Sequence, residues 1–529
     1  MGICDSSGAN GKGTNSNPLY GKMDHSKGTN EQKFFNDFRN LMNIQKQEKF
    51  SEKIRLLASI NNINSNCEYK IKIYNIIGNK KLSLNEFGNC SILEKSIAKL
   101  DSPIIITYFF HKQQDLLIEI YITENGSTTK TYEENTCLSR IMGSRNFTFQ
   151  KNIPSNTNEV LVIQAVKIEE NSQDITMKLE IPPPNGDFNF YKDIGKQIFY
   201  EIYSDTILYQ SECLDTQGKF LPIRIPLKLF KNNLIKIRFY KITQLIDKLN
   251  VNIYELSNQK IFNINCNGLT LQVILKSKIT KNYTFIDYLK AGVEIGLSVA
   301  IDFTRSNGNP NEPTSLHYIG GNQQNQYERS LFACGNIVGY YDYDQLYPCF
   351  GFGAKISGEE KEIFNLNFKD DPNVAFVQGI IDAYHNAINI VELWGPTYFA
   401  PIIREINKTI KGQNNKLKYH ILMILTDGII EDMQDTINEL VEGSFLPLSV
   451  IIIGVGNADF SKMVFLDHDN DKLINSNGVK ASRDLVQFVP FLKCESNPEQ
   501  LSFEVLEEIP RQIVDYYEQN NLDPFNLTK

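Results

Sequence analysis

Side chains that bind hard metal ions follow an apolar run in the second half of the sequence. The run Leu297–Ile301 leads into Asp302, and Thr304 and Ser306 then follow on alternate positions. A carboxylate and hydroxyls supply hard oxygen donors, which suit Mg²⁺, Ca²⁺ or Mn²⁺ rather than zinc or copper. Because such an apolar run is typical of a buried strand, these residues predict a metal site at the carboxyl end of a strand.

Two later segments can supply further oxygen ligands. Thr397 lies in a tight turn of sequence WGPT, and Asp427 follows another apolar run in the sequence LTDG. Since the carboxyl ends of parallel strands share one edge of a sheet, these side chains are expected to meet Asp302 there. Mg²⁺ binds about six oxygens and usually keeps some waters. Waters or a carboxylate of a partner would therefore complete the shell.

The elements that must hold these groups alternate in type from Thr284 onward. Buried strands are expected at Leu297–Ile301, Leu346–Phe352, Tyr419–Leu425 and Leu448–Gly454, and helices at Gly379–Val391, Met433–Val441 and Arg511–Gln519. Strands alternating with amphipathic helices predict a doubly wound, Rossmann-like α/β domain with a parallel sheet. We place this domain at residues 280–520, followed by a short tail at residues 521–529.

The preceding region consists of short strands separated by polar loops. Candidates are Tyr69–Tyr74, Pro103–Phe109, Leu116–Ile122, Gln197–Tyr203 and Leu234–Tyr240. This spacing predicts antiparallel β-sandwiches. The pattern occurs twice, and three consecutive prolines at residues 182–184 lie near the junction. Two sandwiches of ordinary domain size are therefore expected, at residues 46–178 and 179–279.

The first 45 residues combine a polar tail with a possible lipidation signal. Residues 1–30 are rich in Gly, Ser and Asn, which predicts disorder, and a short helix is expected at Phe34–Leu41. The start, MGICDS, fits the pattern for myristoylation of Gly2, with Cys4 beside it as a palmitoylation candidate. One myristoyl chain binds membranes weakly, so the second lipid would make anchoring stable. The alternative is a chance match of a short motif.

Composition argues against several classes of function. The formal net charge of −8 gives no support for nucleic acid as the main partner. The nine cysteines are scattered without a CxxC pair, which argues against a zinc ribbon and fits a reducing compartment. Neither an apolar run of about 18 residues nor the apolar core of a secretory signal is found. These features predict a cytoplasmic protein.

Signals for other kinds of site are incomplete. The glycines of GFGAK at residues 351–355 and GVGNA at residues 454–458 do not complete a phosphate-binding motif, and tight turns explain them. The segment Asp467–Asp471 begins like a calcium-binding EF-hand but lacks its turn glycine and final glutamate. His385 is expected to make a structural hydrogen bond. Since no GxSxG motif occurs either, an ordinary hydrolase is not supported.

Several phrases resemble the copine family closely. They include YTFIDYL at Tyr283–Leu289, VAIDFTRSNGNP at Val299–Pro310, YPCFGFGAKI at Tyr347–Ile356, GPTYFAP at Gly395–Pro401, LTDGII at Leu425–Ile430 and IIIGVGNADF at Ile451–Phe460. The resemblance covers about residues 280 to 520. It implies two C2 domains followed by a von Willebrand A domain. The metal-ion-dependent adhesion site of that domain then falls on Asp302, Thr304, Ser306, Thr397 and Asp427.

The sandwich region departs from the family pattern. Copine C2 domains bind Ca²⁺ through S-D-P and D-x-D motifs on loops at one end. Here Ser65-Asn66-Cys67 stands in the first S-D-P position, and Tyr121–Glu124 and Tyr240–Thr243 stand in the D-x-D positions. Dehydrating Ca²⁺ requires more negative charge than these residues supply. Both C2-like domains are therefore expected to be insensitive to calcium.

Together the residues and the resemblance predict a non-enzymatic adaptor that participates in membrane trafficking or signalling. Its expected partners are membrane phospholipid and proteins, with an acidic residue of a protein partner completing the shell of Mg²⁺ or Mn²⁺. The expected location is peripheral, at the inner face of the plasma membrane or on endomembranes. Three alternatives stay open: calcium-dependent phospholipid binding as in typical copines, metal-dependent phosphoryl transfer, and a pure lipid-binding module with a vestigial A domain. Phosphoryl transfer lacks the support of a lysine-bearing phosphate loop.

Overall fold

The computed structural model describes most of the chain beyond residue 50. The described residues are 51–529 without 64–66, 86, 94–95, 155–157, 169–172, 187–188, 191–196, 205, 231, 233, 243, 254–257, 267, 322, 414, 468–472, 496 and 528–529. Several predictions lie outside these residues, namely lipidation at Gly2 and Cys4, the tail and the helix Phe34–Leu41, Ser65-Asn66, and the EF-hand-like segment beyond Asp467. Among the described residues, no helix combines the length and the apolar composition needed to cross a membrane.

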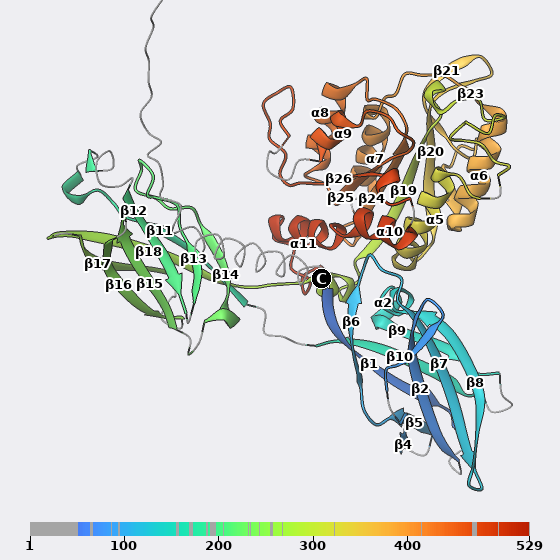
Figure 1. Ribbon diagram of the computed structural model, residues 1–529, viewed down its shortest axis with the longest axis horizontal. Coiled ribbons are helices and arrows are strands. Elements are labelled where there is room, and N and C mark those ends of the chain that lie inside the picture. Colours follow the sequence, from blue (N-terminus) through green and yellow to red (C-terminus); the bar gives the residue numbers. More distant parts are fainter. Residues whose placement is uncertain are drawn as a thin grey trace, which may run out of the picture. The chain divides into compact units, whose positions relative to one another are not determined.

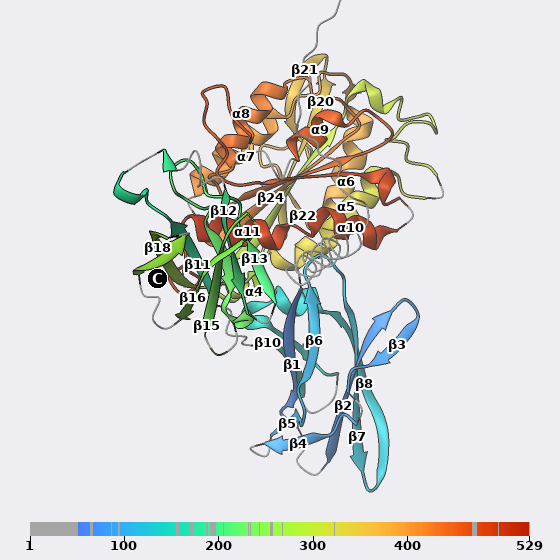
Figure 2. The same ribbon diagram turned by 60° about the vertical axis from the view of Figure 1, so that its left-hand side comes forward.

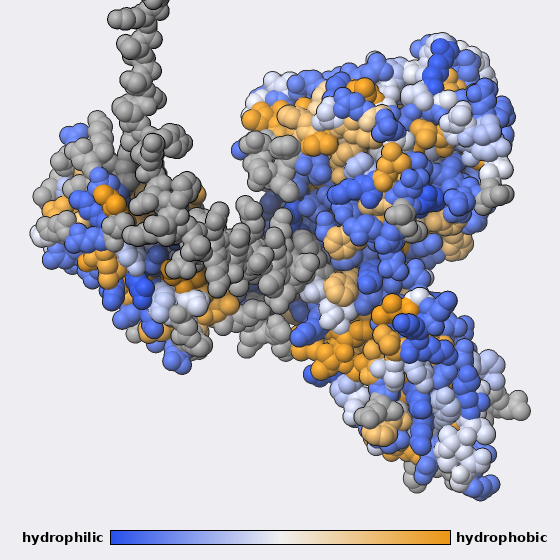
Figure 3. Space-filling view, in the orientation of Figure 1, coloured by the Kyte–Doolittle hydropathy of each residue, from blue (hydrophilic) through white to orange (hydrophobic). Residues whose placement is uncertain are grey.

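Two antiparallel sheets form the first sandwich, as the strand pattern predicts. Its elements are β1 Ser51–Asn61, β2 Glu68–Ile77, β3 Lys80–Ser83, β4 Cys90–Leu93, β5 Ile97–Leu100, β6 Ile104–Phe109, β7 Asp115–Glu124, β8 Ser127–Cys137, α2 Leu138–Met142, β9 Thr148–Asn152 and β10 Val160–Lys167. One sheet has the order β4-β5-β1-β10-β9 with β6 beside β1, and the other has the order β3-β2-β7-β8. Alternate residues of β2, Tyr69, Ile71 and Ile73, point into the core. The mostly exposed strand β8 gives the β7–β8 hairpin a largely hydrophilic surface (Figure 3).

A second sandwich is built from two four-stranded antiparallel sheets. Its strands are β11 Gln173–Glu180, β12 Ile198–Tyr203, β13 Ile207–Gln210, β14 Ile223–Pro226, β15 Leu234–Lys241, β16 Gln244–Asn252, β17 Asn258–Cys266 and β18 Leu269–Lys281. They form two sheets, β14-β11-β18-β17 and β13-β12-β15-β16. The order β13-β12-β15-β16 corresponds to β3-β2-β7-β8 of the first sandwich. The repeat detected in the sequence is thus a repeat of topology.

The domain borders differ from the predicted ones at two places. β11 pairs along its length with β18, so the predicted border between residues 178 and 179 falls inside a strand of the second sandwich. The break lies instead between Lys167 and Gln173. Periodicity identifies a strand but not its partner, because pairing is set by distant residues. In the predicted tail, Asp523 accepts a hydrogen bond from the hydroxyl of Tyr283 at 2.5 Å, so this segment contacts the α/β domain.

The C-terminal α/β domain is built on a mainly parallel sheet. Its strands are β19 Glu294–Asp302, β20 Leu346–Ile356, β21 Glu359–Asn365, β22 Asn373–Ala375, β23 Glu392–Leu393, β24 Lys418–Thr426, β25 Leu448–Gly454 and β26 Val486–Pro490. The order is β21-β20-β19-β24-β25-β26, with only the edge strand β21 antiparallel along this path. Every residue of β25 is buried, as expected for a strand covered on both faces. The four predicted buried strands are confirmed.

Helices cover both faces of this sheet (Figures 1 and 2). They are α4 Phe285–Lys290, α5 Gln326–Val338, α6 Phe376–Ile390, α7 Ala400–Gln413, α8 Met433–Gly443, α9 Ser461–Leu466, α10 Pro498–Leu506 and α11 Ile509–Gln519. Neighbouring residues of β19 enter different cores. Val299 packs in the core that contains Tyr384 of α6, whereas Ala300 packs in the core that contains Ile403 of α7. This alternation confirms the doubly wound arrangement.

A charge cluster lies at the amino ends of the central strands. Carboxylate oxygens of Glu294, Asp342 and Asp344 lie within 4.8 Å of one another. The Nζ atom of Lys418, at the start of β24, lies 3.8, 3.5 and 3.7 Å from them. Burial raises the pKa of Asp342 to about 8, and the charge of Lys418 opposes that rise. Lys418 therefore already supplies the cation of this cluster, at the edge opposite Asp302.

Replacing Lys418 by methionine should destabilise the protein in a pH-dependent way. The variant leaves the buried carboxyl of Asp342 without its cation, which costs about 3–5 kcal/mol of unfolding free energy near pH 8. Because carboxyls with a raised folded-state pKa are destabilising only when ionised, stability should fall as the pH rises from about 4 towards 8, and acid should reduce the loss. Urea unfolding at both ends of this range measures it. Lys416→Met, at an exposed residue of the same segment, is the control; an equal loss at both pH values would contradict this account.

Candidate metal centre

The carboxyl edge of the sheet brings four predicted ligands into one row of hydrogen bonds. Asp302 ends β19, and its Oδ1 atom accepts a hydrogen bond from the Thr304 hydroxyl at 2.6 Å. The Thr304 hydroxyl lies 2.9 Å from the Ser306 hydroxyl, which donates to Oδ1 of Asp427 at 2.8 Å. Asp427 directly follows β24, the strand next to β19. The segments predicted to meet at this edge do meet there.

Thr397 approaches the same group from a third segment. A Cβ atom built on Gly428 would lie 2.6 Å from Oγ1 of Thr397 and 3.4 Å from Oδ2 of Asp302. The two oxygens therefore face the same small space, which stays open because residue 428 is glycine. The backbone around Thr397 is fixed by Glu431, whose side chain accepts from Thr397 N at 3.2 Å and whose own N donates to Thr397 O at 3.0 Å. All five predicted ligands thus line one place.

The cluster is sealed on most sides. The exposed fraction is 0% for Asp302, 3% for Thr304, 5% for Thr397 and 6% for Asp427. Ser306, in contrast, is exposed. Ser306 is thus the most accessible of the five candidate ligands.

Two carboxylates in this buried setting affect each other's ionisation. Burial raises the pKa of Asp302, and hydrogen bonds from Thr304 and Thr426 oppose that rise. Burial and then the charge of Asp302 raise the pKa of Asp427 to about 7. A divalent cation between the two would remove the repulsion, because an opposite charge favours the ionised form of a carboxyl.

Two further residues hold the carboxylates, and sequence analysis did not identify them. Thr426 donates a hydrogen bond from its hydroxyl to Oδ2 of Asp302 at 2.5 Å. Asn307 donates to Oδ1 of Asp427 at 2.8 Å and accepts from the Tyr327 hydroxyl at 2.6 Å. In the sequence, Thr426 stands next to Asp427 and Asn307 stands next to Ser306. Position beside a predicted ligand does not show which of these side chains points into the site.

His317 supports the site from inside the domain. Its Nε2 atom lies 2.9 Å from the carbonyl oxygen of Asp302, which can only accept, so Nε2 carries the proton. Its Nδ1 atom then accepts from the Tyr384 hydroxyl at 2.8 Å. The ring stacks on Phe303 and Tyr327, with centroids 5.3 and 4.6 Å away. Burial lowers the pKa of His317 to about 3, so the imidazole stays neutral.

Another histidine takes the role that the sequence predicted for it. His385 lies on α6, and its Nε2 atom is 2.8 Å from Oε1 of Glu328. Glu328 also accepts from the backbone N of Asn325 at 2.7 Å and completes the capping box of α5. His385 thus makes a structural hydrogen bond that ties α6 to the start of α5.

The chain's single tryptophan borders the site. The backbone N of Trp394 donates to Phe303 O at 3.1 Å and to Gly353 O at 3.0 Å, and its O accepts from Arg305 N at 2.9 Å. Gly353 has a φ of +72°, and a Cβ there would lie 2.3 Å from Cγ2 of Thr304, so a tight turn explains this glycine. Changes at Thr304 should therefore reach the environment of Trp394.

The positions compared with the copine D-x-D motif lie in strands and tight turns. β7 continues to Glu124 and β8 begins at Ser127, so the turn contains only Asn125 and Gly126, both with positive φ. In the second sandwich, Lys241 at the end of β15 pairs with Gln244 at the start of β16. Glu124, the single acidic residue of its set, accepts a hydrogen bond from Cys67 Sγ at 3.1 Å. The described parts of both hairpins offer no cluster of carboxylates.

Solved structures resemble parts of the chain at low identity. The paired C2 domains of Extended-Synaptotagmin 2 are 9% identical, with 44% of this chain and 93% of that chain covered and a TM-score of 0.19. The SpRpn10 VWA domain is 14% identical, with coverage of 40% and 94% and a TM-score of 0.26. The manganese-loaded TRAP protein of Plasmodium vivax is 10% identical, with coverage of 39% and 74% and a TM-score of 0.26. At such scores these likenesses carry no argument about function.

The family comparison is specific to the C-terminal domain. Residues 315–525 match the Copine family. The matched region includes Thr397 and Asp427 and begins after Ser306. Two antiparallel sandwiches precede the doubly wound domain in the chain, in the order expected of C2 domains followed by a von Willebrand A domain. Residues 315–525 of the chain are therefore a Copine domain.

Proposed function

We propose that the chain is a membrane-associated adaptor whose A domain binds a protein partner through Mg²⁺ or Mn²⁺. The observation that carries this proposal is the hydrogen-bonded row Asp302–Thr304–Ser306–Asp427, with the Thr397 hydroxyl facing Asp302 across Gly428. The proposal agrees with the Copine match of residues 315–525 and with the order of two sandwiches followed by a doubly wound domain.

The residues present fit such an ion. They offer two carboxylates and three hydroxyls, all hard oxygen donors of the kind that Mg²⁺ and Mn²⁺ prefer. The Thr397 hydroxyl has no hydrogen-bond partner among the described residues, although the residue is buried, so it is available as a ligand. A bound dication would supply an open coordination position for a carboxylate oxygen of the partner.

The remaining residues of the site orient these ligands. Asp302 accepts hydrogen bonds from the N and Oγ1 atoms of Thr304, at 2.8 and 2.6 Å, and from Thr426. Asn307 fixes Asp427, and Tyr327 in turn fixes Asn307. Outer hydrogen bonds of this kind hold ligating oxygens in place and tune their affinity. The site is therefore organised for binding before a partner arrives.

A binding role suits the site better than phosphoryl transfer. Gly353 serves a close approach to Thr304 and not a phosphate. His317, the imidazole that contacts Asp302, uses both ring nitrogens in hydrogen bonds and is fully buried, so it cannot act as a base on a bound substrate. Turnover of ATP that disappears in Asp302→Ala would instead favour the enzyme.

The sandwiches are proposed to act at membranes without calcium. Their hairpins close tightly, between Glu124 and Ser127 and between Lys241 and Gln244, where the family has D-x-D ligands. Ca²⁺ usually takes 6–8 oxygen ligands, which these turns do not supply. Lipids on Gly2 and Cys4 would then anchor the chain at the cytoplasmic face of a membrane.

Asp302→Ala should abolish metal binding and partner capture while the domain stays folded. Mn²⁺ affinity should fall by more than the roughly 10–100-fold typical of losing an outer hydrogen bond, because a direct ligand is removed. Trp394 fluorescence and Mn²⁺ electron paramagnetic resonance measure binding, and pull-downs in Mg²⁺ and EDTA measure capture. Asp435→Ala, at an exposed residue of α8, is the control. Capture that is unchanged in Asp302→Ala and in EDTA would refute the metal bridge.

Gly428→Ala should weaken Mn²⁺ binding about 10–100-fold without unfolding the chain. The added methyl group would occupy the space between Thr397 and Asp302 and push their oxygens apart. Isothermal titration with Mn²⁺ measures the affinity. Gly412→Ala is the matched control, because a Cβ there meets nothing within 4 Å. If Gly428→Ala and Gly412→Ala bind Mn²⁺ with equal affinity, Thr397 is not a ligand of the metal.

Vesicle binding by the Asp302→Ala chain should not depend on calcium. With the A-domain site disabled, equal fractions should pellet with phosphatidylserine vesicles in Ca²⁺ and in EGTA, because neither described hairpin turn carries an aspartate cluster. Sedimentation followed by gel densitometry gives the bound fraction. If this variant pellets only in Ca²⁺, the sandwiches bind phospholipid in a calcium-dependent way, as in typical copines, and the prediction is wrong.

A further inference from the structure

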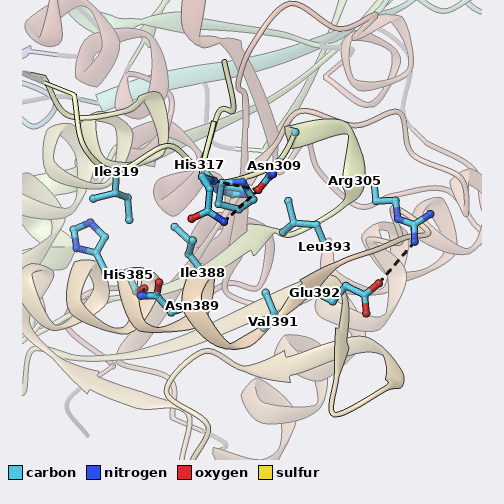
Figure 4. A pocket seen from close by; sticks show the side chains of 13 residues that line it. Arg305, Asn309, His317, Ile319, His385, Ile388, Asn389, Val391, Glu392 and Leu393 are labelled. Atoms are coloured by element: carbon cyan, nitrogen blue, oxygen red, sulfur yellow. Dashed lines mark hydrogen bonds and ion pairs between the residues drawn. The ribbon is translucent and has the colours of Figure 1, made fainter. Parts of the chain in front are cut away.

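A groove opens beside the candidate metal centre. It has a volume of about 880 Å³, which lies within the range of ligand pockets. One wall comes from the segment after β19, including Arg305 and Asn309. The other comes from the last turns of α6, with His385 and Ile388, and from the chain that leads to Leu393 (Figure 4).

The groove borders the segments that carry the candidate metal ligands. Leu393 directly precedes Trp394, and Thr304 forms a parallel bridge with Trp394. His317 lines the groove and also donates to the carbonyl oxygen of Asp302. A polypeptide that placed a carboxylate at the candidate centre would therefore have neighbouring residues at the groove.

The chemistry of the lining selects for an uncharged side chain. Ile319, Ile388 and Leu393 provide apolar surface, and Ile319 is 42% exposed. The charged residues of the lining, Arg305 and Glu392, pair with each other at 3.9 Å and so largely cancel. An additional acidic group would gain little from this pair, since exposed ion pairs are weak and already neutral.

The rim suits the main chain of a peptide. Asn309 and Asn389 lie at the groove, and an amide side chain both donates and accepts hydrogen bonds. Peptide N–H and C=O groups need such partners when the neighbouring side chain is buried. The groove thus matches an extended segment with an apolar side chain better than a compact anion.

We propose that this groove binds an aliphatic side chain next to the acidic residue of the partner, so that the A domain recognises an acidic residue and an aliphatic residue in one extended segment. The proposal rests on the proposed function, because the acidic residue is the one held at the metal. The metal would require an acidic residue in the partner. The groove would discriminate among partner segments that contain such a residue.

A peptide selection on the full chain tests this proposal. The probe is a peptide library with one fixed aspartate flanked by random positions, selected in Mg²⁺ and in EDTA. Enrichment of aliphatic residues at a fixed offset from the aspartate, only in Mg²⁺, is expected. Ile319→Gln and Ile388→Gln should each lower affinity for a selected peptide about tenfold or more. Their Mn²⁺ affinity, followed by Trp394 fluorescence, should stay unchanged.

Ile390→Gln is the matched control, because Ile390 ends α6, is 48% exposed and does not line the groove. Peptides enriched in Mg²⁺ without an aliphatic preference would overturn the groove proposal and leave the metal bridge intact. Absence of any Mg²⁺-dependent enrichment would overturn both. Equal peptide losses in Ile390→Gln and in the two groove variants would also reject the groove.

Discussion

The repulsion between two buried carboxylates, Asp302 and Asp427, governs the carboxyl edge of the A-domain sheet. Burial raises the pKa of both, and the charge of Asp302 adds to the rise at Asp427. Hydroxyls and amides surround the pair and lower this cost, because hydrogen bonds to an ionised carboxyl favour it. Thr304 and Ser306 link the two carboxylates directly. The loops after β19 and β24 are shaped by this requirement.

At the opposite edge of the same sheet, repulsion among carboxylates is reduced in another way. There, Lys418 supplies one positive charge close to Glu294, Asp342 and Asp344 from within the chain. No ion pair to Asp302 or Asp427 occurs among the described residues. A cluster of acidic residues alone does not distinguish a structural charge cluster from a metal site. The position of the nearest cationic side chain helps to distinguish the two. An acidic edge that contains its own cation fits a structural role, whereas an acidic edge without an ion pair is suited to binding a cation.

Each sandwich keeps two packed antiparallel sheets, while the hairpins depart from the calcium motif of copines. Pairing of Glu124 with Ser127, and of Lys241 with Gln244, closes the ladders with short turns. Short turns favour rigid strands, but they leave no loop on which several carboxylates can converge. The proposed binding of a divalent metal is therefore assigned to the A domain. The groove lined by Ile319 and Leu393 would make metal-dependent binding selective for certain partners.

The sequence by itself determined the classes of element and most of the site. Uniformly apolar runs identified the parallel strands, because strands buried on both faces carry few polar residues, and the family phrases identified all five predicted ligands. Tertiary structure alone decided the rest. It assigned β11 to the second sandwich, and it brought Asn307 to Asp427 across 120 residues of chain. Periodicity reports the environment of a segment but not its distant contacts, so Thr426, Asn307, His317 and the groove emerged only when the strands assembled.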